Sequence, residues 1–539
     1  MTQINSSQNQ GKQLLTPFIS LISFIHFNNN SWFSLRITTI LFILFNVISA
    51  EAGSGSLIEN GLTYTVYFNG TGSSAVPLYA AVIGPSNGPT NFSGTADILS
   101  SVTLSYNYIE NGAAYTRYLT ANVTTINSSA FESCSGLTNV NIPSSITTIS
   151  DHAFNYCTSL NNVNIPNSVT TIGVCAFQGC HSLTSIIIPN SVTFLANSSF
   201  RDCTNLVSIK INNSMSSIEP LTFHGCYRLS NVDFGNNITS IGNNAFEGCS
   251  ALKIVTIPNS VTSIAKEAFF KCSSLDSLSL GNSVLYIGEA AFRDCTSLTN
   301  VIIPNSVTTI ARYVFYGCTN LKSIAMGNSV SSIGRTTFYD CTNLSKVIIS
   351  DIDSWCRIKF EKSTGNPLMY AYRLFLNDNE ITDLEIPSTL STIENYSFYN
   401  GINLTSVRIP STITSIGDYT FYYCSNINRV TCLAATPPTI SSTTFTSNLI
   451  PDTLYVPFNS VELYRNHQYW GMFKNILPIS LQPGDVDDDG EVSISDVTAL
   501  VDMLLTGNIT TNGATDVNGD GEVSISDVTA LIDMLLFSN

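Results

Sequence analysis

One spacing constrains the fold of this chain more than any other feature: the pattern Phe-x-x-Cys recurs every 23 residues. Ten phenylalanines from Phe131 to Phe338 keep this interval, and the same frame resumes at Phe375, Phe398 and Phe421. Only the step from Phe338 to Phe375 breaks it, by an insertion of 14 residues. A strict period of roughly 20–29 residues is typical of a solenoid, in which each repeat forms one coil.

The apolar positions within one repeat explain why it coils. After Phe154, Val163 and Ile165 alternate as in a half-buried strand. Pro166 ends that strand, because proline cannot donate to a ladder, and Ile172 predicts a second short strand on the opposite wall. One coil buries too few side chains to offset the entropy lost in ordering its backbone, so stability must come from stacked neighbours. The expected fold class is a mainly β solenoid of 23-residue coils.

The repeat unit LTSIIIPNSVTFLANSSFRDC and its copies resemble the BspA-like leucine-rich repeats of secreted and surface proteins, over about residues 120–435. This resemblance implies an extracellular protein that adheres to host proteins and cells and has no catalytic activity. The ligand expected for the solenoid is a host protein or a glycan, and neither is singled out.

The frame and the resemblance together predict the domain organisation. Residues 53–130 are expected to form an N-terminal β cap, residues 131–435 the repeats, and residues 436–478 a C-terminal cap. The insertion is placed near residues 350–370. A short linker at residues 479–483 precedes a small C-terminal module, which is expected to be all-α.

The N-terminal region predicts export. An apolar run at residues 38–50 is preceded by Arg36 and followed by Ala-Glu-Ala, as in a signal-peptide core. The run is shorter than the ~20 residues that a helix needs to span a bilayer. We therefore expect residues 1–52 to be a signal peptide with a long leader, and the protein to be secreted and held at the cell surface through a scaffold. An uncleaved anchor is the alternative, and no membrane span is expected in the mature chain.

The cysteines follow the same frame, since eleven of the fourteen stand three residues after a frame phenylalanine. Export favours disulfides in general, but stacked strands place equivalent Cβ atoms ~4.8 Å apart, beyond the ~3.8 Å of a disulfide. A column of buried thiols is therefore favoured, while Cys175, Cys356 and Cys432 lie off the column and are freer to pair. Five scattered histidines and unpaired cysteine spacing argue against a zinc site.

Two groups of side chains are candidates for a ligand-binding surface on the solenoid. The residue after the frame phenylalanine becomes tyrosine late in the array, at Tyr316, Tyr339, Tyr399 and Tyr422. A tyrosine column can stack on a sugar or anchor a protein partner, and an aromatic ladder that only stabilises the coils is the alternative. The insertion adds Trp355 in a basic and aromatic cluster, for which a binding face and a structural bulge are both open.

The net charge of −16 is concentrated at one end of the chain. Residues 482–539 contain ten Asp, two Glu and no Lys or Arg, so the other residues together carry only −4. This distribution excludes a basic nucleic-acid-binding protein and indicates a local acidic site.

Two near-identical segments, residues 485–505 and 516–536, account for this acidity, and 18 of their 21 positions are the same. Each places acids or amides at loop positions 1, 3 and 5, glycine at 6, a hydroxyl at 9 and a carboxylate at 12. This spacing wraps oxygen ligands around Ca²⁺, with the residue at position 7 contributing its carbonyl. The predicted ligands of two Ca²⁺ ions are Asp485, Asp487, Asp489, Glu491, Ser493 and Asp496 in the first loop, and Asp516, Asn518, Asp520, Glu522, Ser524 and Asp527 in the second.

A loop and helix duplicated in this way resemble a type I dockerin, over residues 484–539. The resemblance implies docking to a cohesin module of a scaffold protein, with loop positions 10 and 11 helping to choose the partner. Those positions are occupied by Ile494 and Ser495, and by Ile525 and Ser526. The Ile-Ser pair departs from the Ser-Thr pair that is common in cellulosomal dockerins, so the type of cohesin stays open.

The leading hypothesis is a secreted, non-catalytic adhesion protein whose solenoid binds a ligand and whose dockerin-like module attaches it to a scaffold. One competing hypothesis is an accessory or catalytic component of a polysaccharide-degrading, cellulosome-like complex. Glycoside hydrolysis needs two carboxylates flanking a cleft, and the outward strand positions offer only scattered acids, so no catalytic residue is predicted. A third hypothesis makes the calcium module only a stabilising terminal domain.

Overall fold

The structure is a computed structural model that describes residues 52–70, 75–86, 88–446, 450–479, 483–487, 491–509 and 514–537. The expected signal peptide, except for its last residue, and the predicted calcium ligand Asp489 lie outside the described residues. The chain divides into two compact units, Met1–Met215 and Ser216–Asn539.

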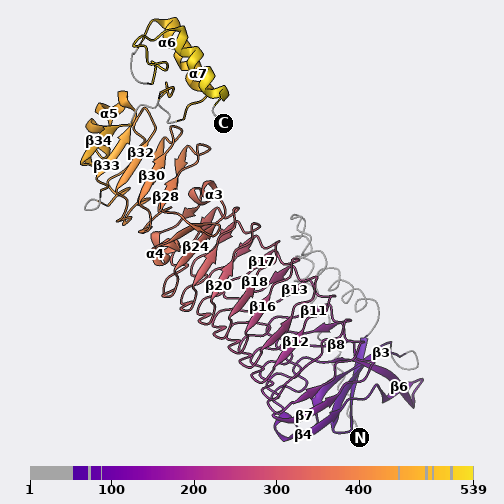
Figure 1. Ribbon diagram of the computed structural model, residues 1–539. Coiled ribbons are helices and arrows are strands. Elements are labelled where there is room, and N and C mark those ends of the chain that lie inside the picture. The colour runs from indigo at the N-terminus through magenta and orange to yellow at the C-terminus, as the bar shows by residue number, and fades with distance from the viewer. Residues whose placement is uncertain are drawn as a thin grey trace. The chain divides into compact units, whose positions relative to one another are not determined.

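The first unit begins with a β region ahead of the first coil (Figure 1). Its long strands are β1 (Ala52–Glu59), β2 (Leu62–Asn69), β3 (Val76–Pro85), β5 (Ser101–Glu110) and β6 (Ala113–Ile126). β1, β2 and β3 pair antiparallel in chain order, and β5 and β6 form a hairpin. Along β2, buried Leu62, Tyr64 and Val66 alternate with half-buried residues, as expected where one face of a sheet covers the core.

The same β region continues into the coils of the first unit. β3 pairs in parallel with β6, and β6 pairs with β8 (Thr148–Ile149), which belongs to the first coil. β10 (Thr171–Ile172) and β11 (Phe194–Leu195) then extend this wall, each offset by 23 residues from its neighbour. The opposite wall contains β4 (Ser93–Asp97), β7 (Gly136–Asn141) and β9 (Asn162–Val163). The two strands per coil that were predicted from Val163 and Ile172 are thus confirmed.

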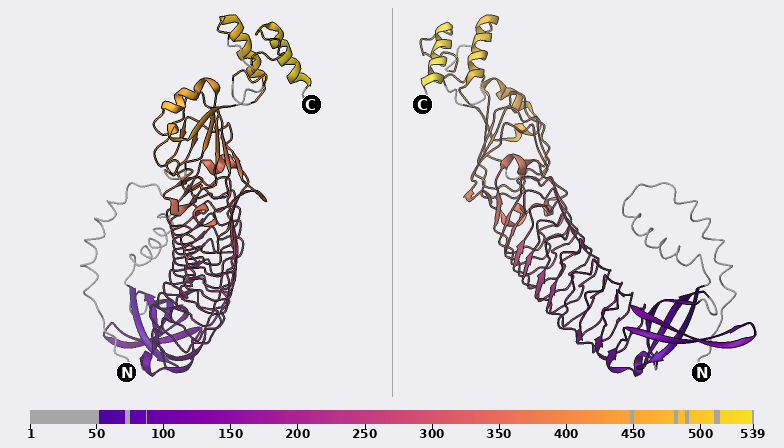
Figure 2. Two further views of the ribbon diagram at one scale, coloured as in Figure 1. Left: turned by 60° about the vertical axis from the view of Figure 1, so that its left-hand side comes forward. Right: turned by 90° about the vertical axis from the view of Figure 1, so that its right-hand side faces the viewer.

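The second unit repeats this coil with two walls of short parallel strands, which lie side by side along the stack (Figure 2). One wall contains β16 (Ile254–Thr256), β18 (Ser277–Ser279), β20 (Asn300–Ile302), β22 (Ser323–Ala325), β24 (Lys346–Ile349) and β26 (Leu374–Leu376), and β27 (Asn379–Glu380) closes it as a hairpin with β26. The other contains β13 (Ser217–Ile218), β15 (Ser240–Ile241), β17 (Ser263–Ile264), β19 (Tyr286–Ile287), β21 (Thr309–Ile310), β23 (Ser332–Ile333) and β25 (Lys359–Phe360).

The later coils of the second unit form separate sheets. One sheet contains β28 (Asp383–Glu385), β30 (Ser406–Ile409), β32 (Arg429–Cys432), β33 (Thr453–Val456) and β34 (Asn475–Pro478). The facing wall contains β29 (Thr392–Ile393) and β31 (Ser415–Ile416). The short helix α5 (Val461–Asn466) and buried Trp470 close the last coils.

The core of the coils is built from the two columns that the period predicts. Frame phenylalanines are fully buried and stack on one another, as Phe269 does on Phe246 and Phe292 at 5.2 and 5.3 Å between ring centroids. All fourteen cysteines are free, and all except the half-buried Cys175 are buried, which confirms a column of buried thiols rather than disulfides. Nine thiols of the column donate to the carbonyl of the frame phenylalanine one coil earlier, for example Cys157 Sγ to Phe131 O at 3.0 Å.

The structure corrects two assignments made from the frame. Phe375 is half-buried on β26 and is not in the phenylalanine column, because β26 pairs with β24 and turns this side chain outward beside Lys346. The insertion before it folds as α3 (Ile352–Cys356) and α4 (Leu368–Ala371). Cys356 and Cys432 are buried and free, so the expectation that they are available for pairing is also wrong.

Each coil turns tightly around its phenylalanine, through two residues with positive φ. Glu267 and Lys271, which flank Phe269 at two positions before and after it, have φ of 56° and 58°. The same positions are left-handed in coil after coil, and they are mostly not glycine. This backbone carries strain at non-glycine residues, and periodicity alone did not predict it.

The C-terminal module folds as two loop–helix units, as predicted. α6 (Ile494–Thr506) and α7 (Ile525–Phe537) share a small core of Leu500, Val528 and Leu531. Gly484, just before the first loop, has φ of 92°, and a Cβ there would lie 2.8 Å from Leu531 Cδ1. Neither these helices nor any other helix of the described residues is long and apolar enough to cross a membrane.

Candidate metal centre and ligand-binding surfaces

The first predicted calcium loop brings three carboxylates together. Asp485, Asp487 and Asp496 each offer an oxygen, and these atoms all lie within 4.8 Å of one another. Asp485 is 3 % exposed and Asp496 is fully buried, so this negative charge is partly removed from water. Burial of carboxylates is unfavourable unless a cation neutralises them or several hydrogen-bond donors stabilise their charge.

Asp496 closes this loop onto the start of α6. Its Oδ1 accepts from the backbone N–H groups of Val486 at 2.6 Å and Asp487 at 3.0 Å, and its Oδ2 accepts from Ser493 N at 2.7 Å. Ser493 in turn caps the helix by accepting from Ser495 N at 3.2 Å. Residue 12 of the loop therefore fixes both the loop entrance and the helix N-terminus, as a capping box does.

The second loop repeats this arrangement. Asp527 is fully buried and accepts from Asn518 N at 3.2 Å and Ser524 N at 2.9 Å. Asp516 Oδ2 accepts from Gly521 N at 2.8 Å, and Asp520 Oδ1 accepts from Glu522 N at 2.9 Å.

One atom of the second loop lacks a partner. Asp516 Oδ1 is buried and has no hydrogen-bond partner among the described residues. A cation bound in the loop would give this oxygen a partner. The side chains of Glu491 and Glu522 are exposed, which agrees with position 7 contributing only a backbone carbonyl. The oxygen-only donor set of both loops fits Ca²⁺.

The predicted partner-binding positions stand at the outer start of each helix. Ile494 and Ile525 are both 80 % exposed, and Ser495 and Ser526 beside them are exposed as well. The same pair of positions is thus exposed in both repeated units.

The four predicted tyrosines form two stacked pairs instead of one column. Tyr316 stacks on Tyr339 at 5.4 Å between ring centroids, and Tyr399 stacks on Tyr422 at 5.9 Å. The insertion and β26 separate the pairs along the chain, because they take the place of a regular coil. The Arg293 guanidinium lies 4.7 Å from the Tyr316 ring centroid and extends the first stack.

Sequence reasoning missed a second set of tyrosines, two residues before the frame phenylalanine. Tyr396 and Tyr419 stack at 5.2 Å, and Tyr419 contacts Tyr422 at the same distance. We call Tyr396, Tyr399, Tyr419, Tyr422 and Tyr423 the tyrosine cluster. Burial raises the pKa of Tyr396 and Tyr399, so both phenols stay neutral at physiological pH. The repeated tyrosine at this position of two neighbouring repeats was the available signal.

Trp355, a candidate for ligand binding, is not a surface residue, so of the two alternatives for the insertion the structural one holds for this side chain. Its side chain is 1 % exposed, and its indole Nε1 donates to Ser397 O at 2.9 Å. Trp355 therefore anchors the insertion in the core and offers no contact to a ligand.

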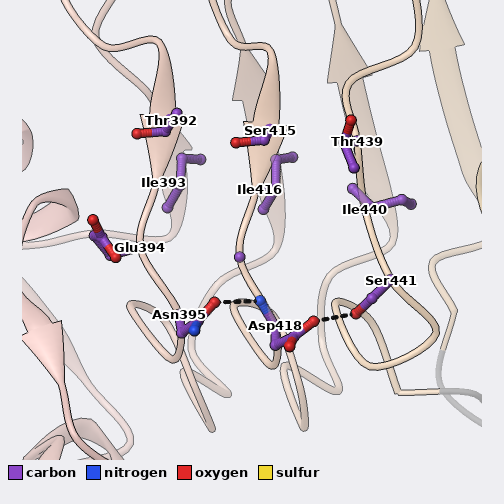
Figure 3. A pocket seen from close by; sticks show the side chains of 11 residues that line it. Thr392, Ile393, Glu394, Asn395, Ser415, Ile416, Asp418, Thr439, Ile440 and Ser441 are labelled. Atoms are coloured by element: carbon purple, nitrogen blue, oxygen red, sulfur yellow. Dashed lines mark hydrogen bonds between the residues drawn. The ribbon is translucent and has the colours of Figure 1, made fainter.

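A trough of about 400 Å³ runs across three coils at β29 and β31 (Figure 3). Thr392, Ser415 and Thr439 occupy equivalent positions along it, above the buried Ile393, Ile416 and Ile440. Its wall is formed by Glu394, Asn395, Asp418 and Ser441. Asn395 Oδ1 accepts from Asp418 N at 2.7 Å, and Asp418 Oδ1 accepts from Ser441 Oγ at 2.5 Å, so the wall is held in place from coil to coil.

The fold and these sites define a repeat solenoid with an appended calcium-loop module. The sequence profile of the BspA-type leucine-rich repeat region matches residues 124–253, 239–365 and 371–466, more than half of the chain. The chain therefore belongs to the BspA-type leucine-rich repeat family. The type I dockerin profile matches residues 483–536. Both resemblances stated from the sequence are confirmed, and dockerin domains in general bind calcium and attach to cohesin-bearing partners.

Two solved structures are similar to this chain. A leucine-rich repeat protein from Bacteroides ovatus is 25 % identical, covering 79 % of this chain and 100 % of its own, with a TM-score of 0.48. A leucine-rich cell surface protein from Faecalibacterium prausnitzii is 22 % identical, covering 74 % of this chain and 97 % of its own, with a TM-score of 0.36. These TM-scores are too low to carry an argument about this chain. No curated protein matches its sequence significantly.

Proposed function

We propose that this protein is an exported, non-catalytic binding component that attaches to a scaffold through calcium-dependent docking of residues 484–539 to a cohesin. Two Ca²⁺ ions, one in each loop, order the module. The observation that carries this proposal is the cluster of Asp485, Asp487 and Asp496, with oxygens within 4.8 Å of one another at the start of α6. The module contains no Lys or Arg to neutralise these groups, so metal binding supplies part of its folding free energy.

In this proposal the solenoid is the ligand-binding arm. Its stacked tyrosines offer aromatic surface with hydroxyl groups at the edge, on a solenoid that carries little charge. Such side chains suit the binding of a sugar or a protein partner. The proposed domain organisation is the one expected from the sequence, with caps at residues 53–130 and 436–478 and a short linker at residues 479–483. Secretion through the signal peptide at residues 1–52 places the protein outside the cell, where the scaffold holds it at the surface.

Binding of immobilised cohesins from the same organism tests the docking step. Wild type should bind at least one cohesin in Ca²⁺, and the double variant D496A/D527A should lose that binding, because both loops then lack their position-12 carboxylate. The matched control D502N/D533N removes the same number of charges from the two helices outside the loops and should bind like wild type. Equal binding by D496A/D527A would refute calcium-dependent docking, and absence of any cohesin interaction would favour a purely stabilising calcium module.

A second candidate function is polysaccharide hydrolysis, because Glu394 and Asp418 line one trough and glycosidases use two carboxylates. Purified protein incubated with plant and host polysaccharides should release no sugar. Release that disappears in E394Q would establish the enzymatic function instead.

A further inference from the structure

The trough beside β29 and β31 is lined by hydroxyl, amide and carboxylate side chains together with three isoleucines. Its floor repeats a hydroxyl group in three successive coils, at Thr392, Ser415 and Thr439. None of its eleven lining residues, all of which the structure describes, is Lys, Arg or His. An anionic ligand would meet Glu394 and Asp418 without any compensating cation, so the trough favours a neutral or cationic ligand.

Part of the wall is available for hydrogen bonding. Asp418 Oδ1 is engaged by the hydroxyls of Ser441 and Thr443. Within the described residues, no hydrogen bond or ion pair engages the Glu394 carboxylate, which is half-buried at the side of the trough. This carboxylate can accept from ligand hydroxyls, and the Asn395 amide adds a donor. Such paired acceptors and donors suit a ligand rich in hydroxyl groups.

The tyrosine cluster lies directly beside this wall. Tyr396 and Tyr419 follow the wall residues Asn395 and Asp418 in the chain, and φ values of 65° and 59° fix their positions at the turn. Tyr423, on the same turn as Tyr419, is 45 % exposed. Aromatic faces next to hydrogen-bonding groups match the two kinds of surface of a sugar ring, the apolar C–H face and the hydroxyl edge.

A second trough, at β19, β21, β23 and β25, provides a contrast within the molecule. It has a volume of about 470 Å³ and is lined by Tyr286, Glu289, Arg312, Lys359 and Glu361, among others. Arg312 and Glu361 form a two-point ion pair there, with hydrogen bonds at 2.7 and 2.6 Å. Arg312 and Glu361 in the second trough thus neutralise each other, whereas the Glu394 carboxylate in the trough at Ser415 has no such partner among the described residues.

We propose that the trough at Thr392, Ser415 and Thr439, together with the tyrosine cluster, binds an uncharged polysaccharide chain. The proposal rests on the ligand-binding role proposed for the solenoid and names the class of ligand. Equivalent hydroxyls recur at the ~4.8 Å spacing of stacked strands, so a chain of repeating sugars that runs along the coils meets a repeating set of partners. A lysine-rich peptide is the competing ligand.

Isothermal titration of the full chain with neutral hexasaccharides of β-glucan, xylan and mannan tests this proposal. At least one should bind, and Y396S/Y419S and the isosteric E394Q should each weaken that binding at least tenfold. The controls Y313S, at the equivalent tyrosine position of an upstream coil, and E289Q, in the second trough, should leave it unchanged. Circular dichroism checks that each variant is folded.

Three results would overturn the proposal. One is the absence of binding by all three hexasaccharides at millimolar concentration. Another is binding that survives in both Y396S/Y419S and E394Q. The third is selective binding of oligolysine that E394Q abolishes. Hexasaccharide binding should persist in EDTA, whereas cohesin docking should not, so a failure of the glycan site is distinguishable from a failure of the calcium-dependent module.

Discussion

Replacing Phe269 with alanine tests whether the buried phenylalanine column supports the solenoid. Phe269 is fully buried and stacks on rings at 5.2 and 5.3 Å on both sides. A buried Phe→Ala change costs about 3–5 kcal/mol, and two lost aromatic contacts add about 0.5–1.5 kcal/mol each. We expect the free energy of unfolding to fall by about 4–6 kcal/mol, since these contributions partly overlap.

Phe375 provides a control from the same sequence frame. It is half-buried on β26 and contacts Lys346 and Arg373 by cation–π interactions, each worth about 0.5–1 kcal/mol. F375A should therefore cost only about 1–2 kcal/mol.

Urea unfolding in Ca²⁺, followed by tryptophan fluorescence, measures both variants. Trp355 and Trp470 are buried in the coils of the second unit, the third tryptophan, Trp32, belongs to the expected signal peptide, and the dockerin module contains none. The fluorescence of the mature chain therefore reports on the solenoid. Equal losses in F269A and F375A would refute the argument that burial in the column, rather than the sequence frame, determines the contribution.

Four further outcomes are expected. T336G should be more stable than T336A by about 1 kcal/mol in thermal unfolding, because Thr336 has φ of 62° and only glycine is unstrained there. Equal stabilities of the two variants would contradict a strained turn. Burial raises the pKa of Cys134 to about 11 and of Cys341 to about 12, above the ordinary 9.0. The stability that these thiols contribute should therefore be full below pH 9.0 and decline as the pH rises through 11. Rapid labelling of native thiols at about pH 8 would contradict their burial. EDTA should reduce the helical signal of residues 483–537 and leave the tryptophan fluorescence unchanged, whereas a helical signal unchanged in excess chelator would exclude folding by metal. The single variant I494D should still bind cohesin, and I494D/I525D should not, because the two units present the same exposed residue. Loss of cohesin binding in I494D alone would assign docking to one unit.

The period of 23 residues was sufficient to predict the walls, the phenylalanine column and the buried thiols, because identical coils place identical positions one above another. It failed at Phe375, where pairing of β26 with β24 decides which way the side chain points. It also did not reveal the left-handed turns at residues such as Glu267 and Lys271, since the usual glycine signal is missing there.

The calcium loops were predictable because metal ligation dictates residue type at each position, and Asp485, Asp487 and Asp496 do converge. The trough and the tyrosine cluster were not predicted as a unit. Their residues come from different positions of neighbouring repeats, and only the coil geometry brings Asn395, Tyr396 and Asp418 together. For Trp355 the sequence left a binding face and a structural bulge both open, and its burial favours the structural role.

Reversible cohesin binding by the full chain shows whether Ca²⁺ controls docking. The chain is passed over immobilised cohesins from its own organism in Ca²⁺, then in EDTA, and then in Ca²⁺ again within one biosensor cycle. The account predicts capture by at least one cohesin, release in EDTA and renewed capture when Ca²⁺ returns. Capture that persists unchanged in EDTA, or no capture by any cohesin of that organism, would contradict it.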